Sequence, residues 1–308
     1  ENPDKVDVIH LGENLGKRKA IVTALRSCNP IGDLIVLIDS DSIVEKTALE
    51  KLVSCFRDRD IGAVTAHGRA LNPDVNILTK IQDTWYDSSF FVLKGVESYF
   101  NSVTCCSGIL SVYRKEAIWP CLDLWVNDKF LGVEFRPGDD RHLTGFVLGG
   151  NKHYVDKKER KWKVVYCESA HVKTEVPTTF KTWVNQQIRW KKSWVRVFLF
   201  MAPFFYKDRP LLPVITYYLS MSLSLISPII SFRALVFMPL NGNWQFGLLY
   251  LTGLLFIGMM FGFSFKVRNP DAKNRWLYRL LMTPLQFSMS WLLYYALLTI
   301  KKNSWLTR

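Results

Sequence analysis

The pattern of apolar and polar positions divides the chain into two parts near residue 210. Before that point, short apolar runs alternate with stretches whose apolar residues recur at helical spacing, which is typical of an α/β domain. After it, long uncharged runs dominate. We expect strands at residues 6–11, 34–38, 61–66 and 164–166, and helices at 17–28, 45–56, 76–92, 141–148 and 179–201.

Some of these elements carry a more detailed expectation. The continuous Leu/Ile/Val run at 34–38 is typical of a buried central strand, whereas 164–166 fits an edge strand. The strand at 61–66 is expected to end in a loop that holds His67, Gly68 and Arg69. The helix at 179–201 is expected to stop before Pro203, because proline disrupts the helical hydrogen-bond ladder.

The second part contains three runs without charge, at residues 211–232, 234–265 and 280–300. The first and third are close to the ~20 residues that cross a hydrocarbon core. Pro239 and Gly242 indicate a turn inside the second run, followed by a span at 244–265. Buried helices of a large soluble domain are the alternative, but three such runs exceed what a soluble core usually contains.

Basic residues flank the first two spans on one side, with Lys207 and Arg209 before the first and five cations after the second. By the positive-inside bias both flanks are cytoplasmic, and so is the α/β domain. A crossing third run would place the basic tail outside. Because that run also contains Pro284 and Gln286, we expect an interfacial or re-entrant segment. The five cations are Lys266, Arg268, Lys273, Arg275 and Arg279.

The predicted helix at 179–201 joins the two parts. Gln186, Arg189 and Trp190 are spaced i, i+3 and i+4 on it, so they form one patch. Arg189 is suited to contact an anionic group, and the indole of Trp190 offers a flat apolar face to a ligand ring. Tryptophans (Trp183, Trp190, Trp194) on one side and a polar, largely basic stripe (Asn185, Arg189, Lys192, Arg196) on another predict an amphipathic helix at the membrane surface.

Two short motifs near the start of the chain suggest binding of a charged ligand. Gly16, Lys17 and Arg18 place two cations where a loop enters a helix, which suits a phosphate, although such residues are usually just solvated. Asp39 and Asp41 follow an apolar run, where they could share Mg²⁺ or Mn²⁺ with a diphosphate. The alternative for the aspartates is an acidic turn in which Ser42 caps the next helix.

The adjacent carboxylates Asp139 and Asp140 are the candidates for acid–base chemistry. A carboxylate within hydrogen-bond reach of a hydroxyl can take its proton as the hydroxyl oxygen forms a new bond. Neighbouring residues at a helix start point in different directions, so the two can play different parts. The structural alternative is that Asp139 caps the helix at 141–148.

Four motifs in this order, followed by membrane spans, resemble the family 2 processive glycosyltransferases, the membrane synthases of cellulose, chitin and hyaluronan. The resemblance implies an α/β GT-A domain at 1–178, an interface helix at 179–202 and transmembrane or interfacial helices with a nucleotide-facing tail at 203–308. It also implies UDP-sugar donors, Mg²⁺ or Mn²⁺, and export through the enzyme's own channel. The motifs are Gly16-Lys17-Arg18, Asp39-x-Asp41, Gly138-Asp139-Asp140-Arg141 and Gln186-x-x-Arg189-Trp190.

The resemblance also assigns roles to residues. Asp140 matches the general base, with Asp139 supporting it and Arg141 orienting the carboxylates. Trp190 matches the tryptophan beneath the acceptor sugar. The turn Cys106-Ser107-Gly108 matches a C-x-S-G or S-G-P turn below the same sugar, although Ile109 stands where proline is common. Lys17, Arg18, Gln186 and Arg189 are expected at the UDP diphosphate.

The tail of the chain favours one branch of the family. Trp305 and Arg308 resemble a W-G-T-R element of hyaluronan synthases that reaches the nucleotide, with Leu306 in place of glycine. The implied donors are UDP-GlcNAc and UDP-glucuronic acid, and the product is a nascent polysaccharide. Chitin synthase, a non-processive membrane glycosyltransferase and, in another class, a membrane receptor or channel stay open as alternatives.

Composition and the start of the chain add further expectations. The six cysteines lack zinc-ligand spacing, so we expect reduced thiols and no structural zinc. The formal charge is +13, and we expect membrane lipids among the partners and no nucleic acid. We also expect a monomer in the plasma membrane. The chain opens at Glu1 within an apparent strand-bearing domain, so we expect a fragment that lacks the first strand and its uracil-binding residues.

Overall fold

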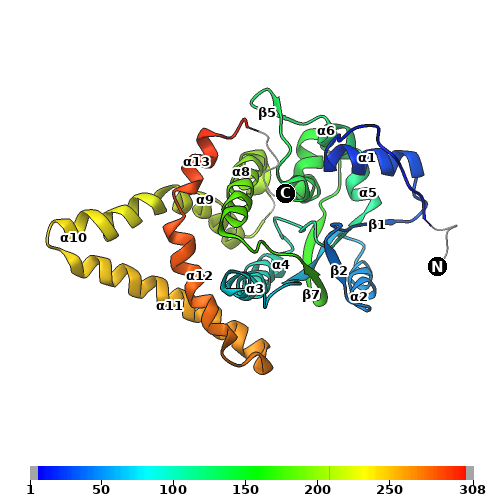
Figure 1. The fold of residues 1–308 in the computed structure, drawn as a ribbon. Helices are drawn as coiled ribbons and strands as arrows, with labels where there is room; N and C mark the ends of the chain where they lie inside the picture. Colours follow the sequence, from blue (N-terminus) through cyan, green and yellow to red (C-terminus); the bar gives the residue numbers. More distant parts are fainter. Residues whose placement is uncertain (1–5, 208, 303–308) are drawn as a thin grey trace.

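A mixed five-stranded sheet forms the centre of the α/β part in the computed structural model, which describes residues 6–207 and 209–302 (Figure 1). Its strand order is β1-β4-β3-β7-β2, in which β3 and β7 run parallel and the other pairs are antiparallel. The strands are β1 (Leu34–Leu37), β2 (Ser42–Val44), β3 (Ile61–Ala70), β4 (Ser111–Arg114) and β7 (Lys163–Thr174), and a separate hairpin pairs β5 (Lys129–Phe130) with β6 (Val133–Glu134).

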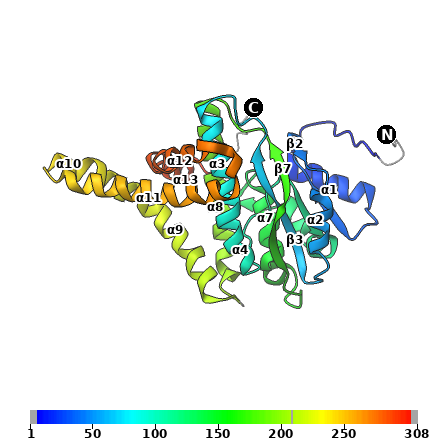
Figure 2. The same ribbon diagram turned by 90° about the horizontal axis from the view of Figure 1, so that it is seen from below.

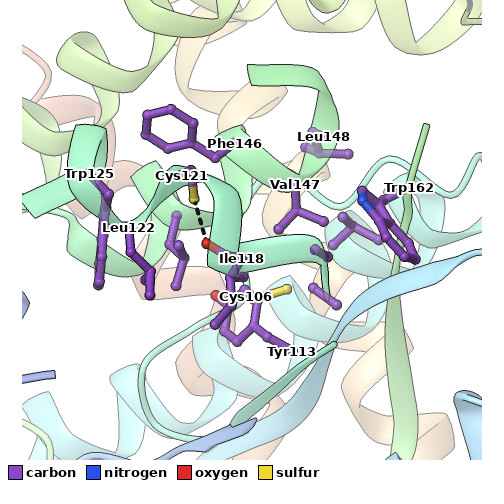
Figure 3. Close-up of a cluster of buried hydrophobic side chains, with 14 of the residues drawn as sticks. Cys106, Tyr113, Ile118, Cys121, Leu122, Trp125, Phe146, Val147, Leu148 and Trp162 are labelled. Carbon is purple, nitrogen blue, oxygen red and sulfur yellow. Dashed lines mark hydrogen bonds between the residues drawn. The ribbon is translucent and has the colours of Figure 1, made fainter. Parts of the chain in front are cut away.

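Helices cover both faces of this sheet. On one face, Leu52 of α2 (Ala48–Cys55) and the C-cap residue Phe56 pack against Val64 and Val112. The other face carries the larger core, in which Trp125, Phe146 and Trp162 belong to one cluster with Tyr113 of β4 (Figure 3). This core is built by α1 (Lys17–Cys28), α5 (Lys115–Ile118), a 3₁₀ turn (Trp119–Cys121), α6 (Leu122–Val126), α7 (Asp139–Gly145), a π-helical segment (Phe146–Val155) and α8 (Phe180–Phe205).

Several strand predictions were wrong, and each error has a local cause. Residues 6–11 form no strand, since Val6 and Val8 are exposed and pair with no strand in the described part of the chain. β1 is an edge strand rather than a central one, with Val36 facing out. β7 runs through the middle of the sheet instead of along its edge, and β3 extends through His67 to Ala70 because hydrogen bonds to buried partners satisfy the imidazole.

The helix predictions held better. α1 has the predicted bounds, and α3 (Ile77–Ser89) begins with a capping box of Asn76 and Thr79 before a π-helical segment (Phe90–Lys94) and α4 (Gly95–Tyr99). Ser42 lies in β2, so the alternative in which it caps the next helix is wrong. α8 continues through Pro203 to Phe205, one turn beyond the predicted stop.

The C-terminal part projects from the sheet as a long helical hairpin (Figures 1 and 2). Among the described residues two helical stretches, Leu211–Leu240 and Trp244–Arg268, are long and apolar enough to cross a membrane. Only 6% and 22% of their most apolar windows are buried by the protein, so their side chains need another apolar surrounding. The hairpin consists of α9 (Leu211–Phe232), a π-helical segment (Arg233–Phe237), α10 (Met238–Leu240) and α11 (Trp244–Arg268).

The third apolar run does not form one long helix. After a 3₁₀ segment (Pro270–Trp276) it breaks into α12 (Leu277–Ser288) and α13 (Leu292–Leu298), each shorter than the ~20 residues of a span. These helices lie between the hairpin and the α/β part, where α12 contacts α3 and α13 contacts α8. This geometry fits the expected non-crossing segment.

Candidate active site

The first cluster of the site forms where three segments meet. These are the first turn of α1, the loop after β1 and the small-residue turn at 106–108. The Lys17 ammonium forms an ion pair with the Asp39 carboxylate, and each side chain is about one third exposed, at 34% and 33%. A Cβ atom at Gly108 would lie 2.8 Å from Lys17 Nζ and 3.0 Å from Asp39 Oδ2. The turn therefore approaches the pair as closely as glycine permits. A cavity of about 340 Å³ lies at the start of α1, and its lining includes Gly16, Lys17, Arg18, Arg136 and Asp139.

Asp140 joins this cluster from the first turn of α7. The Gly108 N–H donates to Asp140 Oδ2 at 3.2 Å, and Cys105 Sγ lies 3.7 Å from the same oxygen. The backbone carbonyl of Asp140 accepts a bond from Thr144, which fixes the turn that presents the carboxylate. The structure thus places a half-buried carboxylate beside Gly108, which also contacts the Lys17–Asp39 pair, and such a group can accept a proton.

The neighbouring carboxylate, Asp139, is buried and faces away from this cluster. Arg18 donates through Nε to Asp139 Oδ1 at 2.8 Å, and its other nitrogens donate to the carbonyls of Trp125 and Phe135 at 2.9 Å. Burial raises the pKa of Asp139, and the charge of Arg18 opposes that rise. Asp139 caps no helix, because the N-cap is Gly138.

This arrangement revises the expectation for Arg18. The side chain is 7% exposed and directs its hydrogen bonds to the protein interior, so its geometry fits fastening of α1 to α7 rather than contact with phosphate. Both adjacent cations line the cavity, but Lys17 is one third exposed and pairs with Asp39, whereas the Arg18 guanidinium is committed to Asp139 and two backbone carbonyls. The supporting role predicted for Asp139 stays a prediction.

A close contact fixes α7 against α8. Gly138 has a φ of 78°, and a Cβ atom there would lie 1.7 Å from Ser193 Oγ. Any side chain at this position would push the two helices apart. Glycine at position 138 therefore sets the distance between the helix that carries Asp140 and the helix that carries Arg189 and Trp190.

Arg189 reaches the carboxylates from α8. Its electrostatic partners include Asp140, Tyr86 and Asp39, and burial lowers the pKa of its guanidinium. The Trp190 ring packs on Trp85 of α3, with centroids 5.8 Å apart and planes 30° apart, and lies 6.3 Å from the ring of Tyr86. Gln186 is half-buried one helical turn before Trp190, and its side-chain Oε1 has no hydrogen-bond partner in the described parts of the chain.

α8 is not the surface helix that its sequence pattern suggests. Trp183 is fully buried against Ile81 and Met282, so it anchors the protein core rather than a membrane. Lys192 donates to the carbonyls of Thr299 and Lys302, and Arg196 pairs with Asp128. The prediction of an exposed basic stripe was wrong because backbone carbonyls at and after the end of α13 bury Lys192, and Asp128 of the α/β part pairs with the buried Arg196.

The small-residue turn predicted below the acceptor is held by hydroxyl groups. The Cys106 N–H donates to Thr144 Oγ1 at 2.9 Å, and the Ser107 N–H donates to Thr65 Oγ1 at 3.1 Å. Burial raises the pKa of Cys105 to about 11 and that of Cys106 to about 12, so both stay as thiols. All six cysteines are free, as expected.

Arg141 and Lys94 bring positive charge to the same turn. Arg141 is desolvated, but nearby Cys105, Asp140 and Glu97 raise the pKa of its guanidinium above the usual value. Lys94 Nζ bonds to the Cys105 carbonyl and, at 3.1 Å, to Ser107 Oγ. Lys94 was missed at the sequence level because one lysine on a helix gives no signal of its destination.

Trp85 and Tyr86 were also missed as members of the site. Burial raises the pKa of Tyr86, and the charges of Asp41 and Asp39 add to that rise, which places the phenol near both carboxylates. The two residues appear in the sequence as an aromatic pair on an amphipathic helix, which is more often part of a core. Only the contact between α3 and α8 identifies them.

The predicted metal ligands supply an incomplete set by themselves. Asp41 accepts a bond from Thr174 at 3.3 Å, and Asp39 is neutralised by Lys17. Within the described ranges, no group of three His, Cys, Asp or Glu side chains could hold a metal. Two carboxylates still fit Mg²⁺ or Mn²⁺, since these ions accept phosphate oxygens and water as remaining ligands. The predicted tail contacts, Trp305 and Arg308, lie outside the described residues.

Comparison with known proteins identifies the family and the fold. Residues 1–193 match the profile described as "Glycosyltransferase like family 2". The chain belongs to this family. Its GT-A-like fold is shared with a mannosyltransferase from Pyrobaculum calidifontis, solved in complex with GDP-Man and Mn²⁺, at a TM-score of 0.57 and 18% identity over 97% of this chain and 70% of the other.

The curated relatives with similar sequences include hyaluronan synthases. One from Streptococcus pyogenes serotype M1 is 29% identical over 317 residues, covering 96% of this chain and 66% of the relative. Another from Streptococcus pyogenes is 36% identical over 183 residues, covering 59% and 41%. Hyaluronan synthase 1 of Xenopus tropicalis is 33% identical over 193 residues, covering 62% and 31%. The chain thus spans less than two thirds of the length of these relatives.

Proposed function

We propose that this protein is a membrane-integrated polysaccharide synthase that transfers sugars from UDP-GlcNAc and UDP-glucuronic acid to a growing hyaluronan chain with inversion. The observation that carries the proposal is the convergence of Asp140, Asp39 and Lys17 on Gly108, with Arg189 within electrostatic reach. The relatives named hyaluronan synthase support the choice of product.

The chemistry follows from the positions of these groups. Asp140 takes the proton of the acceptor hydroxyl, and the oxygen of that hydroxyl forms a bond to the anomeric carbon of the donor. The bond from that carbon to the diphosphate breaks, and the electron pair leaves with UDP. Lys17 and Arg189 are placed to offset the negative charge that develops on the diphosphate. Attack opposite the leaving group inverts the anomeric centre.

A divalent cation fits this scheme as a further source of positive charge. Asp39 and Asp41 would hold Mg²⁺ or Mn²⁺ together with diphosphate oxygens, and the ion would stabilise the leaving group. Trp190 would lie beneath the acceptor sugar, with Cys106, Ser107 and Gly108 forming the turn below it. Arg141 would orient the carboxylates from the next position of α7.

The membrane part completes the proposal. α9 and α11 would cross the plasma membrane, with the catalytic domain cytoplasmic and membrane lipids around the apolar hairpin. The monomer would then pass the nascent polysaccharide from the acceptor site into its own transmembrane channel. The position of α8 between the sheet and α9 supports this path.

Donor dependence tests the proposal. Purified protein reconstituted in lipid vesicles is given UDP-GlcNAc alone, UDP-glucuronic acid alone, or both, with Mg²⁺ or Mn²⁺, and the product is digested with a hyaluronan-specific lyase. We expect lyase-sensitive polymer only with both donors. Insoluble polymer from UDP-GlcNAc alone would point to a chitin synthase and overturn the choice of product.

The Asp140→Asn variant tests the base in the same assay. We expect polymer synthesis to fall by about 10³-fold, within the usual range for loss of a general base, while UDP binding and thermal stability change little. Glycine 108 keeps its amide near the new side chain, so the fold of the turn is preserved. Unchanged synthesis by this variant would remove Asp140 from the mechanism.

A further inference from the structure

A buried ionic cluster connects the end of α11 to α3 and β3. At its centre is Asp87 of α3, whose carboxylate is contacted by His67 Nε2 at 3.1 Å, Arg69 NH1 at 3.3 Å and Arg268 NH1 at 3.1 Å. Asn269 Nδ2 lies 3.4 Å from the same carboxylate. We call these residues, together with Asp83, the Asp87 cluster. None of the assigned roles in sugar transfer uses it.

The chemistry of the cluster makes it a strong connection. The Asp87 side chain is 2% exposed, and the Arg268 side chain is 15% exposed. Burial opposes ionisation of Asp87, but the hydrogen bond from His67 and the charges of Arg69 and Arg268 outweigh it and lower its pKa. A buried carboxylate with several charged donors is held far more tightly than a surface pair.

Arg69 extends the cluster along α3. Its Nε and NH2 groups bond the two oxygens of Asp83 at 2.9 Å each, and its NH1 group bonds Asn269 Oδ1 at the same distance. Asp83 and Asp87 are one turn apart on α3, so the helix is fixed at two successive positions. The end of α11 is fastened at both Arg268 and Asn269.

The same helix, α3, carries the two aromatic residues that contact Trp190, the residue proposed to lie beneath the acceptor sugar. Trp85 lies between Asp83 and Asp87 in the sequence, and its ring stacks on Trp190. Tyr86 packs on Phe90 with planes 15° apart and also lies next to Trp190. The position of α3 therefore decides where the Trp85 and Trp190 rings meet.

We propose that Asp87 and Arg268 are positioning residues for the acceptor: they fasten α3 to the end of membrane helix α11 and thereby hold Trp85 against Trp190. This inference rests on the proposed function. A polymer that moves from Trp190 toward the membrane helices stays bound between transfers only if α3 and the end of α11 keep fixed positions relative to Trp190. Loosening the cluster should shorten the product without impairing donor chemistry.

The Arg268→Gln variant tests the connection with the least disturbance to folding. It removes the Arg268 contacts with Asp87 and with Glu168, leaves Asn269 as the remaining contact of this end of α11, and leaves Arg69 to neutralise the buried carboxylate while His67 stays within hydrogen-bond distance of it. We expect mean product length to fall about fivefold, while KM for both donors and the rate of UDP release without acceptor stay within twofold. Arg268→Lys keeps the charge and should restore most of the length.

A matched control comes from the same turn of α11. Lys266 contacts the Trp276 ring, at 5.5 Å, and takes no part in the Asp87 cluster. Lys266→Gln removes the same charge at the same end of the helix, so its product should keep the length of the wild type. Equal shortening in both variants would assign the effect to membrane surface charge and overturn the proposal.

A double-mutant cycle with Trp85→Leu tests the route of the effect. If Arg268 acts through Trp85, the losses in length should not add when the two changes are combined. Additive losses, or shifts in donor KM as large as the loss in length, would overturn the inference. Wild-type protein that makes no polymer would instead contradict the proposed function, so the two failures are distinguishable.

Discussion

Two clusters of charged residues lie next to each other in the site and differ in how they meet solvent. The open cluster consists of Lys17, Asp39 and Asp140 around Gly108. The buried cluster consists of Arg18, Asp128, Asp139, His142 and Arg196, all below or near one sixth exposure. Both draw on the same two sequence motifs. The open cluster is accessible to solvent, whereas the buried one is enclosed by the fold.

The division follows from helix geometry. Lys17 and Arg18 start α1, and Asp139 and Asp140 start α7, so each adjacent pair points in directions about 100° apart. In each pair one side chain belongs to the open cluster and the other to the buried cluster. Each motif thus places one charged residue at the open cluster beside a neighbour that fixes the helix.

The largest expected effect separates the two cations. Arg18→Met leaves Asp139 buried without its counter-ion, so we expect a loss of about 3–5 kcal/mol in unfolding free energy, or protein that does not fold. The measurement is thermal unfolding in detergent. Arg26→Met, on the same helix, is the control, because its partner Asp123 is 76% exposed and the pair should contribute less than about 1 kcal/mol.

This contrast also shows which features could be predicted from the sequence and which could not. The motif order, the bounds of α1 and the two long apolar helices were predictable because each depends on local spacing. The choice between Lys17 and Arg18 was not, since it depends on carbonyls of Trp125 and Phe135 that folding brings to one of them.

Contacts between distant segments account for the other errors. The sequence of α8 is amphipathic, yet α12 and α13 pack on its apolar residues, and Lys192 and Arg196 are buried by hydrogen-bond partners from elsewhere in the chain. Trp85 joins Trp190 only because α3 packs beside α8. The run at 34–38 is apolar enough for a central strand, but β4 is its only partner among the described strands. The apolar composition of a strand indicates that it is buried, but its place in the sheet depends on how the strands are connected.

The buried cluster should also make stability depend on pH. Burial, with the charges of Arg196 and Arg18, holds the pKa of His142 well below its usual value, so the imidazole stays neutral in the folded protein. The unfolded chain binds a proton below about pH 6.5, and the folded protein does not. Stability should therefore fall as pH drops through this range, by up to about 1.4 kcal/mol per pH unit.

His142→Asn removes this titration while keeping a polar group near Asp128 and Arg196. We expect the variant to lose less thermal stability than the wild type between pH 7 and pH 5.5, when both are followed by the same unfolding assay. Parallel curves for the two proteins would show that His142 is not the group responsible.

The smallest effect on stability belongs to the open cluster. Lys17 and Asp39 are each about one third exposed, so their ion pair is screened by solvent and Lys17→Met should change the unfolding free energy by less than about 1 kcal/mol. Its effect should appear in binding, because the variant lacks the cation nearest Gly108. We expect donor KM to rise about tenfold, equivalent to ~1.4 kcal/mol, and Lys17→Arg to retain most of the affinity.

A variant as unstable as Arg18→Met would show that Lys17 also fastens the fold, and the division between a reactive and a structural member of the motif would then be wrong. Wild-type KM in a stable Lys17→Met protein would instead leave Arg189 as the cation that binds the diphosphate, and the open cluster would reduce to Asp39 and Asp140.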